Sequence, residues 1–204
     1  MKRIYLIITA SIVILLLVDC KKGENDPFIS LISRTSRLKG EWELVEVSEN
    51  RDITYLGDHL YIEYSYSNSY ITEKYTSSWS NDVETYQTKY NLSIVFEDDG
   101  LYNLSEEIED TLYTIEGGWM WSTKSNELEV KKKEAIILFG KKFEIDKINE
   151  KYSNFYTGEL NNGSLLYVDE LRNNKLVIKT DNTYKNESGF EINHVGYRTY
   201  EKIK

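Results

Sequence analysis

The chain has 204 residues, and its 34 acidic side chains outnumber its 25 basic ones to give a formal net charge of -9. Because nucleic-acid phosphates attract clustered Lys and Arg, this balance argues against a nucleic-acid partner. A hydrophobic content of 40% is enough to form a core, so the composition excludes a wholly disordered chain. The length favours one domain, with two as the upper limit.

The N-terminus has the features of an export signal. Lys2 and Arg3 precede an uncharged, mostly apolar run over residues 4–18, which is short of the roughly 20 residues that span a bilayer. The run ends in Leu17-Val18-Asp19-Cys20, which resembles a bacterial lipoprotein signal, and Cys20 is the only cysteine. The resemblance implies removal of residues 1–19 and acylation of Cys20. The alternative is an uncleaved signal anchor with an incidental cysteine.

A tether and a helix are expected after the signal. Residues 20–27 are polar and hold the only proline, which predicts a flexible tether before a domain over residues 28–204. Apolar side chains then recur every three or four residues from Phe28 to Leu38, which predicts a short amphipathic helix with Arg34 and Arg37 mostly off its apolar face. The helix ends at Lys39-Gly40. We expect it to close the end of a core, with a membrane-surface helix as the alternative.

Almost all of the remaining chain has the pattern of β-strands, rich in Tyr, Ile, Val, Thr and Trp and interrupted by turn residues. The expected strands are Glu41–Ser48, His59–Ser67, Tyr70–Ser77, Thr85–Phe96, Leu101–Glu106, Thr111–Ser122, Glu127–Lys132, Ala135–Phe139, Phe143–Ile148, Ser164–Glu170, Lys175–Thr180 and Glu191–Ile203. Asp98-Asp99-Gly100 predicts a tight hairpin turn. Sequential hairpins predict an all-β fold, an antiparallel up-and-down barrel or else a sandwich. Residues 146–163 show no clear period.

Two motifs at the ends of the domain resemble those of lipocalins and fatty-acid-binding proteins. Gly40-Glu41-Trp42 follows the expected helix, and Arg198-Thr199-Tyr200 lies in the last expected strand. The resemblance implies a lipocalin-like barrel in which Arg198 packs over Trp42 and closes the base. The same resemblance also allows Arg198 and Tyr200 to point inward and bind a ligand carboxylate. The lipoprotein opening from Cys20 resembles that of lipocalin-like lipoproteins of Gram-negative bacteria. The alternative is an unrelated β-barrel or sandwich.

The sequence contains no recognisable catalytic pattern. His59 and His194 lack His or Cys neighbours at metal-ligand spacing, so neither a metal site nor another cofactor is expected. A hydrolytic triad is also missing, and the chain is expected not to be an enzyme. Four acidic groups are expected to be solvated at turns, and they are Glu97-Asp98-Asp99, Glu106-Glu107, Glu109-Asp110 and Asp169-Glu170.

Tyrosine occurs 17 times, and Ile62, Tyr64 and Tyr66 alternate so that their side chains share one strand face. These rings either line a ligand cavity or fill the strands. We therefore expect a monomeric, lipid-anchored, non-catalytic protein of the outer membrane that carries a small apolar or amphipathic ligand. Two alternatives stay open: a structural lipoprotein with a filled barrel that docks an envelope partner, and an envelope enzyme acting on glycans or lipids.

Overall fold

A computed structural model describes residues 26, 32–80, 82–125, 134–147, 150–155 and 164–203. The described part is almost entirely β-structure, as expected, and holds one short helix, α2 (Arg34–Leu38). The strands are β1 (Gly40–Tyr55), β2 (Asp58–Ser67), β3 (Tyr70–Ser77), β4 (Val83–Phe96), β5 (Leu101–Ile108), β6 (Thr111–Trp121), β7 (Ala135–Lys147), β8 (Glu150–Phe155), β9 (Ser164–Leu171), β10 (Lys175–Lys185) and β11 (Glu191–Lys202). None of the helices in this part of the chain is both long and apolar enough to cross a membrane.

The strands form a closed antiparallel barrel, as the succession of hairpins predicts. Their order is β6-β5-β4-β3-β2-β1-β11-β10-β9-β7-β8, and a pairing of β6 with β7 closes the ring. Among the described strands, β8 pairs with β7 alone and therefore lies outside the ring. A second contact joins β1 directly to β4 where residues 40–43 pair with residues 93–96. The barrel is therefore narrow at this end, because β1 pairs directly with β4 here. Strands β2 and β3 lie between β1 and β4 only farther along the barrel.

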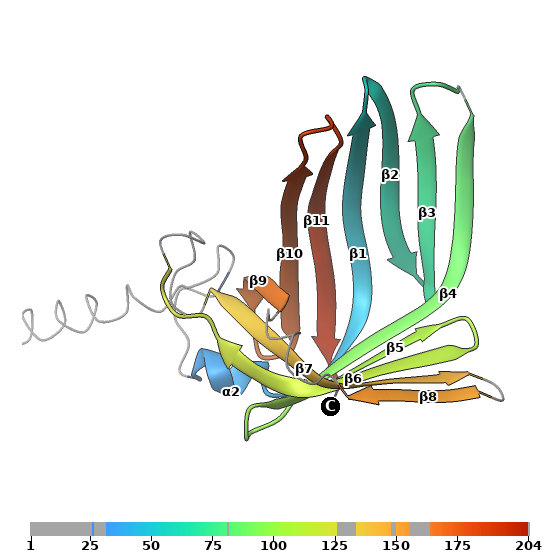
Figure 1. The fold of residues 1–204 in the computed structure, drawn as a ribbon. Helices are drawn as coiled ribbons and strands as arrows, with labels where there is room; N and C mark the ends of the chain where they lie inside the picture. The colour runs from blue at the N-terminus through green and yellow to red at the C-terminus, as the bar shows by residue number, and fades with distance from the viewer. Residues whose placement is uncertain are drawn as a thin grey trace, which may run out of the picture.

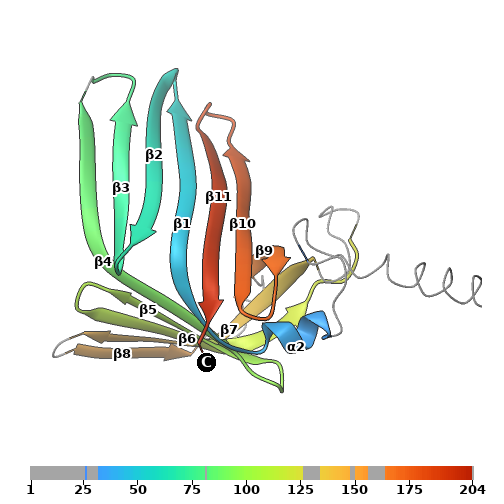
Figure 2. The same ribbon diagram turned by 180° about the vertical axis from the view of Figure 1, so that it is seen from behind.

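The two parts of the sheet lie at a steep angle to each other, as Figures 1 and 2 show from opposite sides. Strands β10, β11, β1, β2, β3 and the first half of β4 stand side by side, and we call their free part the upright sheet: residues 48–55, 58–67, 70–77, 83–89, 180–185 and 191–196. Strands β5, β6 and β8 run across its foot (Figure 1). The long strands β1 and β4 pass from one part into the other.

The hydrophobic core lies at the narrow barrel end. Trp42, Leu44, Phe96, Ile136 and Leu176 are all at most 2% exposed there, on strands from both halves of the ring. Residue alternation on each strand directs these side chains inward. The narrow end is thus filled with packed side chains.

Helix α2 lies against this end of the barrel, but not in the way the sequence predicted. Leu38 is completely buried, as expected, yet Arg34 and Arg37 are also buried, at 6% and 4% exposed. Nη2 of Arg34 donates to the Val168 carbonyl at 3.1 Å, and Nη1 of Arg37 donates to the Leu171 carbonyl. The two arginines supply donors to carbonyl groups of β9, so the expectation that they lie off the packed face is wrong.

One residue of the predicted tether belongs to the folded part. Asp26 is 4% exposed, accepts a hydrogen bond from the Leu171 amide at 2.7 Å and pairs with Arg34 at 3.3 Å. Burial lowers the pKa of Arg34 to about 10 although the Asp26 carboxylate opposes this shift. The predicted signal, Cys20 and the first turn of the predicted helix, including Phe28, lie outside the described residues.

Most expected strands are present, with differences at their ends. The structure joins Ala135–Phe139 and Phe143–Ile148 into β7 and extends β1 and β10 beyond the predicted limits. Strand β8 lies in the stretch where no period was visible. The expected strand Glu127–Lys132 lies outside the described residues. The Asp98-Asp99-Gly100 turn is confirmed, and Gly100 has a φ of 82°.

Candidate functional site

Gly40 and Trp42 lie at the barrel base, where the sequence placed them. Trp42 is 0% exposed, and its indole Nε1 donates to the Leu38 carbonyl at 2.5 Å. Gly40 has a φ of 113°, which L-residues with a side chain rarely adopt, and a Cβ there would lie 3.2 Å from Cε of Lys202. The cation over the Trp42 ring is Lys202, with Nζ 4.9 Å from the ring centroid. Arg198 was expected in this position, and that expectation is wrong.

Arg198 instead forms a two-pronged ion pair with Glu49. Its Nε and Nη2 donate to the two carboxylate oxygens of Glu49 at 2.9 and 3.0 Å. Thr180 donates a further hydrogen bond to Glu49 at 2.8 Å. Burial tends to raise the pKa of Glu49, but the hydrogen bonds and charge of Arg198 outweigh it and hold that pKa below its ordinary value. Glu49 therefore occupies the position that a ligand carboxylate was expected to take.

A histidine and a second arginine adjoin this pair. Nε2 of His194 lies 3.4 Å from a Glu49 oxygen, and burial, with help from Arg51 and Arg198, lowers the pKa of His194. Arg51 lies opposite His194 in the sheet, and its guanidinium carbon is 5.4 Å from the centroid of the Tyr64 ring. The cluster thus joins β1 and β11 through charged side chains, β10 through the Thr180 hydrogen bond and β2 through the ring of Tyr64.

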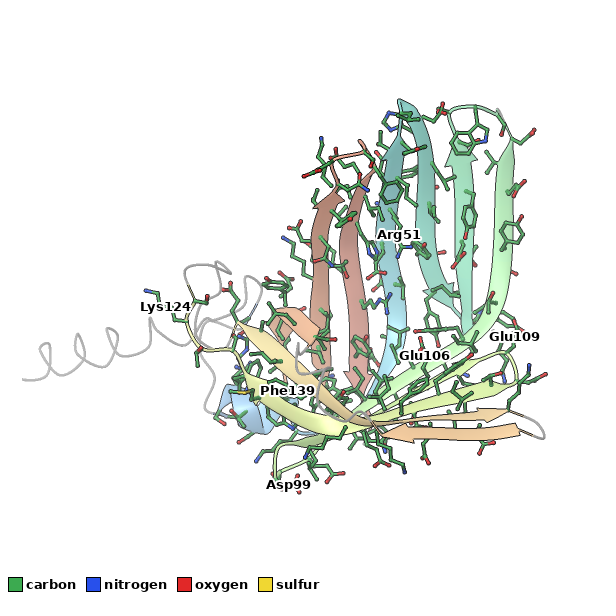
Figure 3. The ribbon with its side chains drawn as sticks, viewed as in Figure 1. Arg51, Asp99, Glu106, Glu109, Lys124 and Phe139 are labelled. Atoms are coloured by element: carbon green, nitrogen blue, oxygen red, sulfur yellow. The ribbon has the colours of Figure 1, made fainter. Side chains whose placement is uncertain are left out.

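Two buried tyrosines adjoin this cluster, Tyr90 on β4 and Tyr200 on β11. Tyr90 is 7% exposed, and its hydroxyl donates to Glu106 at 2.6 Å. Tyr200 is 3% exposed, and its pKa is raised to about 12, mainly by burial. Figure 3 shows Arg51 on the upright sheet and Glu106 on the strands at its foot. Arg198 and Tyr200 share a face, as predicted, but both are held within the protein's own polar network.

The core-side face of the upright sheet is the face that Trp42 and Leu44 occupy at the start of β1 and that Val47, Glu49 and Arg51 occupy after the register shift between Leu44 and Glu46. The register places on it Arg51, Ile53, Tyr55, Leu60, Ile62, Tyr64, Tyr75, Tyr86, Tyr184 and Ile192. Ile62 is 4% exposed, whereas Tyr55, Tyr86 and Tyr184 are at least 50% exposed. The rings gather near the free end of the sheet, where Tyr55 and Tyr184 each contact Phe190. The shared face predicted for Ile62, Tyr64 and Tyr66 follows from the observed register.

The opposite face of the upright sheet carries cross-strand ion pairs. Lys74 meets Glu63 at 2.7 Å, and Lys185 meets Glu191 at 2.9 Å. Such pairs are typical of a face in contact with water and contribute little to stability. The opposite face also exposes the rings of Tyr61, Tyr70 and Tyr197. On the core-side face, by contrast, Tyr55 and Tyr184 gather around Phe190, so the core-side face is the candidate for binding.

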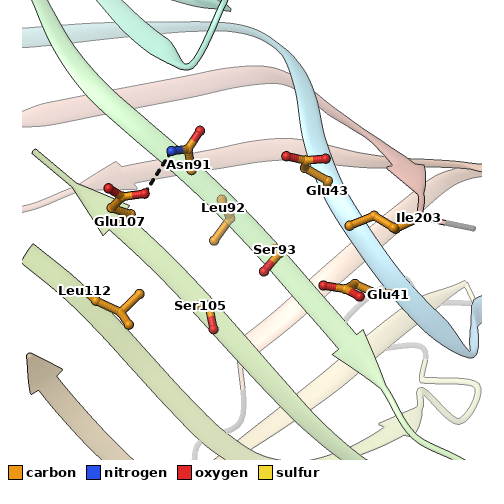
Figure 4. A pocket seen from close by; sticks show the side chains of 9 residues that line it. All are labelled: Glu41, Glu43, Asn91, Leu92, Ser93, Ser105, Glu107, Leu112 and Ile203. Carbon is orange, nitrogen blue, oxygen red and sulfur yellow. Dashed lines mark hydrogen bonds between the residues drawn. The ribbon is translucent and has the colours of Figure 1, made fainter.

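Figure 4 shows a hollow on the outer wall of the barrel between β1, β4 and β5. Glu41 and Glu43 line it because they alternate with the inward-facing Trp42, and Glu107 lines it from β5. Asn91 donates to Glu107 at 3.0 Å. Within the described residues no group of three or more His, Cys, Asp or Glu side chains is arranged to hold a metal ion.

The acidic pair Asp169-Glu170 and the second histidine, His59, each interact with neighbouring side chains of the protein. Asp169 and Glu170 are buried in β9, so the expected solvated turn is wrong for this pair. Glu170 binds Lys175 at 2.9 Å and also Arg172, which explains its burial. His59 lies at the start of β2, 3.4 Å from Asp52. Sequence reasoning missed the importance of Glu49, which alternation alone places on the outside.

No protein-family model, curated protein or solved structure matches the chain.

Proposed function

We propose that the protein is a lipid-anchored, non-catalytic binding protein of the bacterial cell envelope whose amphipathic ligand lies on the core-side face of the upright sheet. The observation that carries the proposal is the exposure of aromatic rings on this face. One face of an antiparallel sheet is commonly packed against the protein core. Where such a face instead exposes a cluster of aromatic rings, it marks a binding surface. The proposed lipid anchor rests on the resemblance around Cys20, and the outer membrane is the location that we propose with it.

The packed narrow end favours this face over the barrel interior as the binding site. Trp42, Phe96 and Leu176 fill the end at which a ligand within the barrel would lie. On the upright sheet, by contrast, Tyr55 and Tyr184 offer apolar contact, while Arg51 offers charge nearer the foot. This combination of rings and charge suits an amphipathic molecule better than a purely apolar one.

A fluorescent fatty acid, 11-dansylaminoundecanoic acid, is a suitable probe for the folded domain. We expect its emission to rise on binding and the double variant Tyr55→Ala/Tyr184→Ala to weaken binding at least tenfold, equivalent to about 1.4 kcal/mol. Tyr197→Ala is the matched control, because Tyr197 is 43% exposed on the opposite face of β11. Equal weakening by the control, or binding unchanged by the double variant, would count against the proposal.

The filled narrow end also supports a second candidate, a structural lipoprotein that docks an envelope partner. In that case the core-side face would meet a protein, and the dansyl probe would bind neither the parent nor the variants. A Tyr55→Ala/Tyr184→Ala variant that fails to co-purify a partner held by the parent after cross-linking in the native envelope would favour this second candidate. Retention of the same partner by the variant would argue against it.

A further inference from the structure

The free end of the upright sheet holds a small pocket of about 140 Å³ between the tips of β2, β3 and β4. The residues that line it include the aromatic Tyr75 and Trp79, the apolar Leu60 and the acidic Asp82 and Glu84. Pockets that hold drug-sized molecules measure roughly 300–1,000 Å³. The size therefore suits a head group rather than a whole ligand.

The loop that carries Trp79 is fixed to its neighbours. The Ser78 amide donates to the His59 carbonyl at 2.9 Å, and the His59 amide donates back to the Ser78 hydroxyl at the same distance. Ser80 then accepts from the Asp82 amide at 3.3 Å. Trp79 is nevertheless 62% exposed. An exposed indole on this loop is a ready contact for a ligand, since Trp is the strongest of the aromatic side chains toward cations.

The strands below the pocket carry alternating tyrosines and glutamates. Tyr75 opposes Glu84 across the β3–β4 pair, and Glu73 opposes Tyr86. The Tyr86 hydroxyl donates to Glu84 at 2.7 Å, and the Tyr75 hydroxyl donates to Glu73. The bond to Glu73 raises the pKa of Tyr75 to about 12, so this hydroxyl stays protonated at neutral pH. The rings of Tyr75 and Tyr86 meet edge to face at 5.5 Å.

The charge at this end of the face is negative. Among the described residues no Lys or Arg forms an ion pair with Asp82 or Glu84, whereas the nearby Lys74 is paired with Glu63 on the opposite face. Two uncompensated carboxylates beside two aromatic rings attract a cation with apolar substituents: the carboxylates supply charge, and the ring faces supply cation–π contact. Acidic side chains alone would bind an organic cation or a metal ion equally well. The aromatic rings of Trp79 and Tyr75 favour the organic cation.

We propose that this pocket binds an organic ammonium group, with the positive charge between Asp82 and Glu84 and the alkyl substituents against Trp79 and Tyr75. The inference deepens the proposed function, on which it rests, because the pocket opens on the core-side face. The ligand class becomes an amphipathic molecule with an ammonium head group. A free organic amine would share this chemistry. The dependence of affinity on the length of the ligand's alkyl chain distinguishes a free amine from an amphipathic ammonium compound.

Calorimetry with choline and its neutral isostere 3,3-dimethylbutan-1-ol, at constant ionic strength, tests the pocket directly. We expect choline to bind at least tenfold more tightly than the alcohol. The double variant Asp82→Asn/Glu84→Gln should weaken choline binding at least tenfold, and Trp79→Leu should weaken it at least fivefold. Glu187→Gln is the control for lost surface charge, because Glu187 is exposed in the β10–β11 turn, and it should leave binding unchanged. Unchanged urea midpoints would show that the variants fold.

Four results would overturn the inference: equal affinity for choline and the alcohol, absence of choline binding to the parent, an equal loss in Glu187→Gln, or binding of Ca²⁺ in place of choline. If the dansyl probe still depends on Tyr55 and Tyr184 in any of these cases, the inference fails and the proposed function stands. If choline binds as expected and dodecyltrimethylammonium binds at least tenfold more tightly, the source is an amphiphile. Equal affinity for the two would identify a free amine as the ligand and leave the pocket assignment intact.

Discussion

Lys202, the last residue of β11, lies over the indole ring of Trp42, its register partner on β1. Its Nζ is 4.9 Å from the ring centroid and donates to the Arg37 carbonyl at 2.8 Å. A single cation thus joins α2, β1 and β11, and burial lowers its pKa below the ordinary lysine value. The closure of the barrel base therefore depends on a lysine at the end of β11, while the arginine four residues earlier serves another cluster.

The two tryptophans Trp42 and Trp79 should respond very differently to truncation. Trp42→Ala should lower the free energy of unfolding by about 3–5 kcal/mol, because a large, fully buried side chain leaves a cavity. Trp79→Ala should change it by less than about 0.5 kcal/mol, since Trp79 is 62% exposed. Urea unfolding followed by circular dichroism measures both. A loss below about 1 kcal/mol for Trp42→Ala would mean that the barrel base is not packed as described.

Gly117 and its neighbour Gly118 provide a second matched pair. A Cβ at Gly117 would lie 1.9 Å from the Phe139 carbonyl oxygen, whereas one at Gly118 would lie 3.7 Å from its nearest neighbour. Gly117→Ala should therefore destabilise the domain by about 3 kcal/mol or more, at the upper end of the cost of overpacking. Gly118→Ala should be nearly neutral. Equal urea midpoints for the two variants would contradict the observed approach of β6 to β7.

The cluster around Glu49 should make stability depend on pH. The pKa of His194 is lowered in the folded state, so stability should begin to fall as the pH drops below about 6.5, where the unfolded chain takes up this proton first. The pKa of Glu49 is also lowered, so its contribution is complete above about pH 4.5 and is lost below it. His194→Gln should remove the first step between pH 7.5 and 5.5. A variant whose urea midpoint falls as far as the parent's over that interval would show that His194 is not responsible.

The anchor is tested at Cys20. In the native host, Cys20→Ser should leave an uncleaved precursor that incorporates no labelled fatty acid, because the thiol is the acceptor in lipoprotein processing. Detergent-phase partition measured after removal of the signal should fall relative to the parent. If the variant still partitions as the parent does, Cys20 carries no lipid and the chain is held in the envelope by other means.

The strand pattern could be predicted because alternation and turn residues are local features. The Asp98-Asp99-Gly100 turn and the limits of β3 follow directly from them. Residues 49–55 of β1 were not predicted as strand because their polar side chains lack alternation with apolar ones. They are extended because β2 and β11 pair with them on both sides. The extended conformation of residues 49–55 therefore depends on pairing with neighbouring strands, and β11 is distant in the sequence.

The position of Glu49 depends on a β-bulge that the sequence does not reveal. Between Leu44 and Glu46 the register with β11 shifts by one residue. Strict alternation from Trp42 would place Glu49 outside, but the extra residue turns it inward toward Arg198. Arg198 was assigned to Trp42 from the resemblance to lipocalins, which the register does not support. Arg198 and Lys202 share one face of β11, and only the three-dimensional register decides which of them reaches the ring.

The most direct test of the proposed function is a methyl NMR titration of the folded domain with 11-dansylaminoundecanoic acid below its critical micelle concentration. We expect shifts at Ile53, Leu60 and Ile192 on the core-side face, and none at Val83 and Val195 on the opposite face or at Ile136 and Leu176 in the core. Shifts centred on Ile136 and Leu176 would place the ligand inside the barrel end. The absence of shifts at Ile53, Leu60 and Ile192 would contradict binding on the upright sheet.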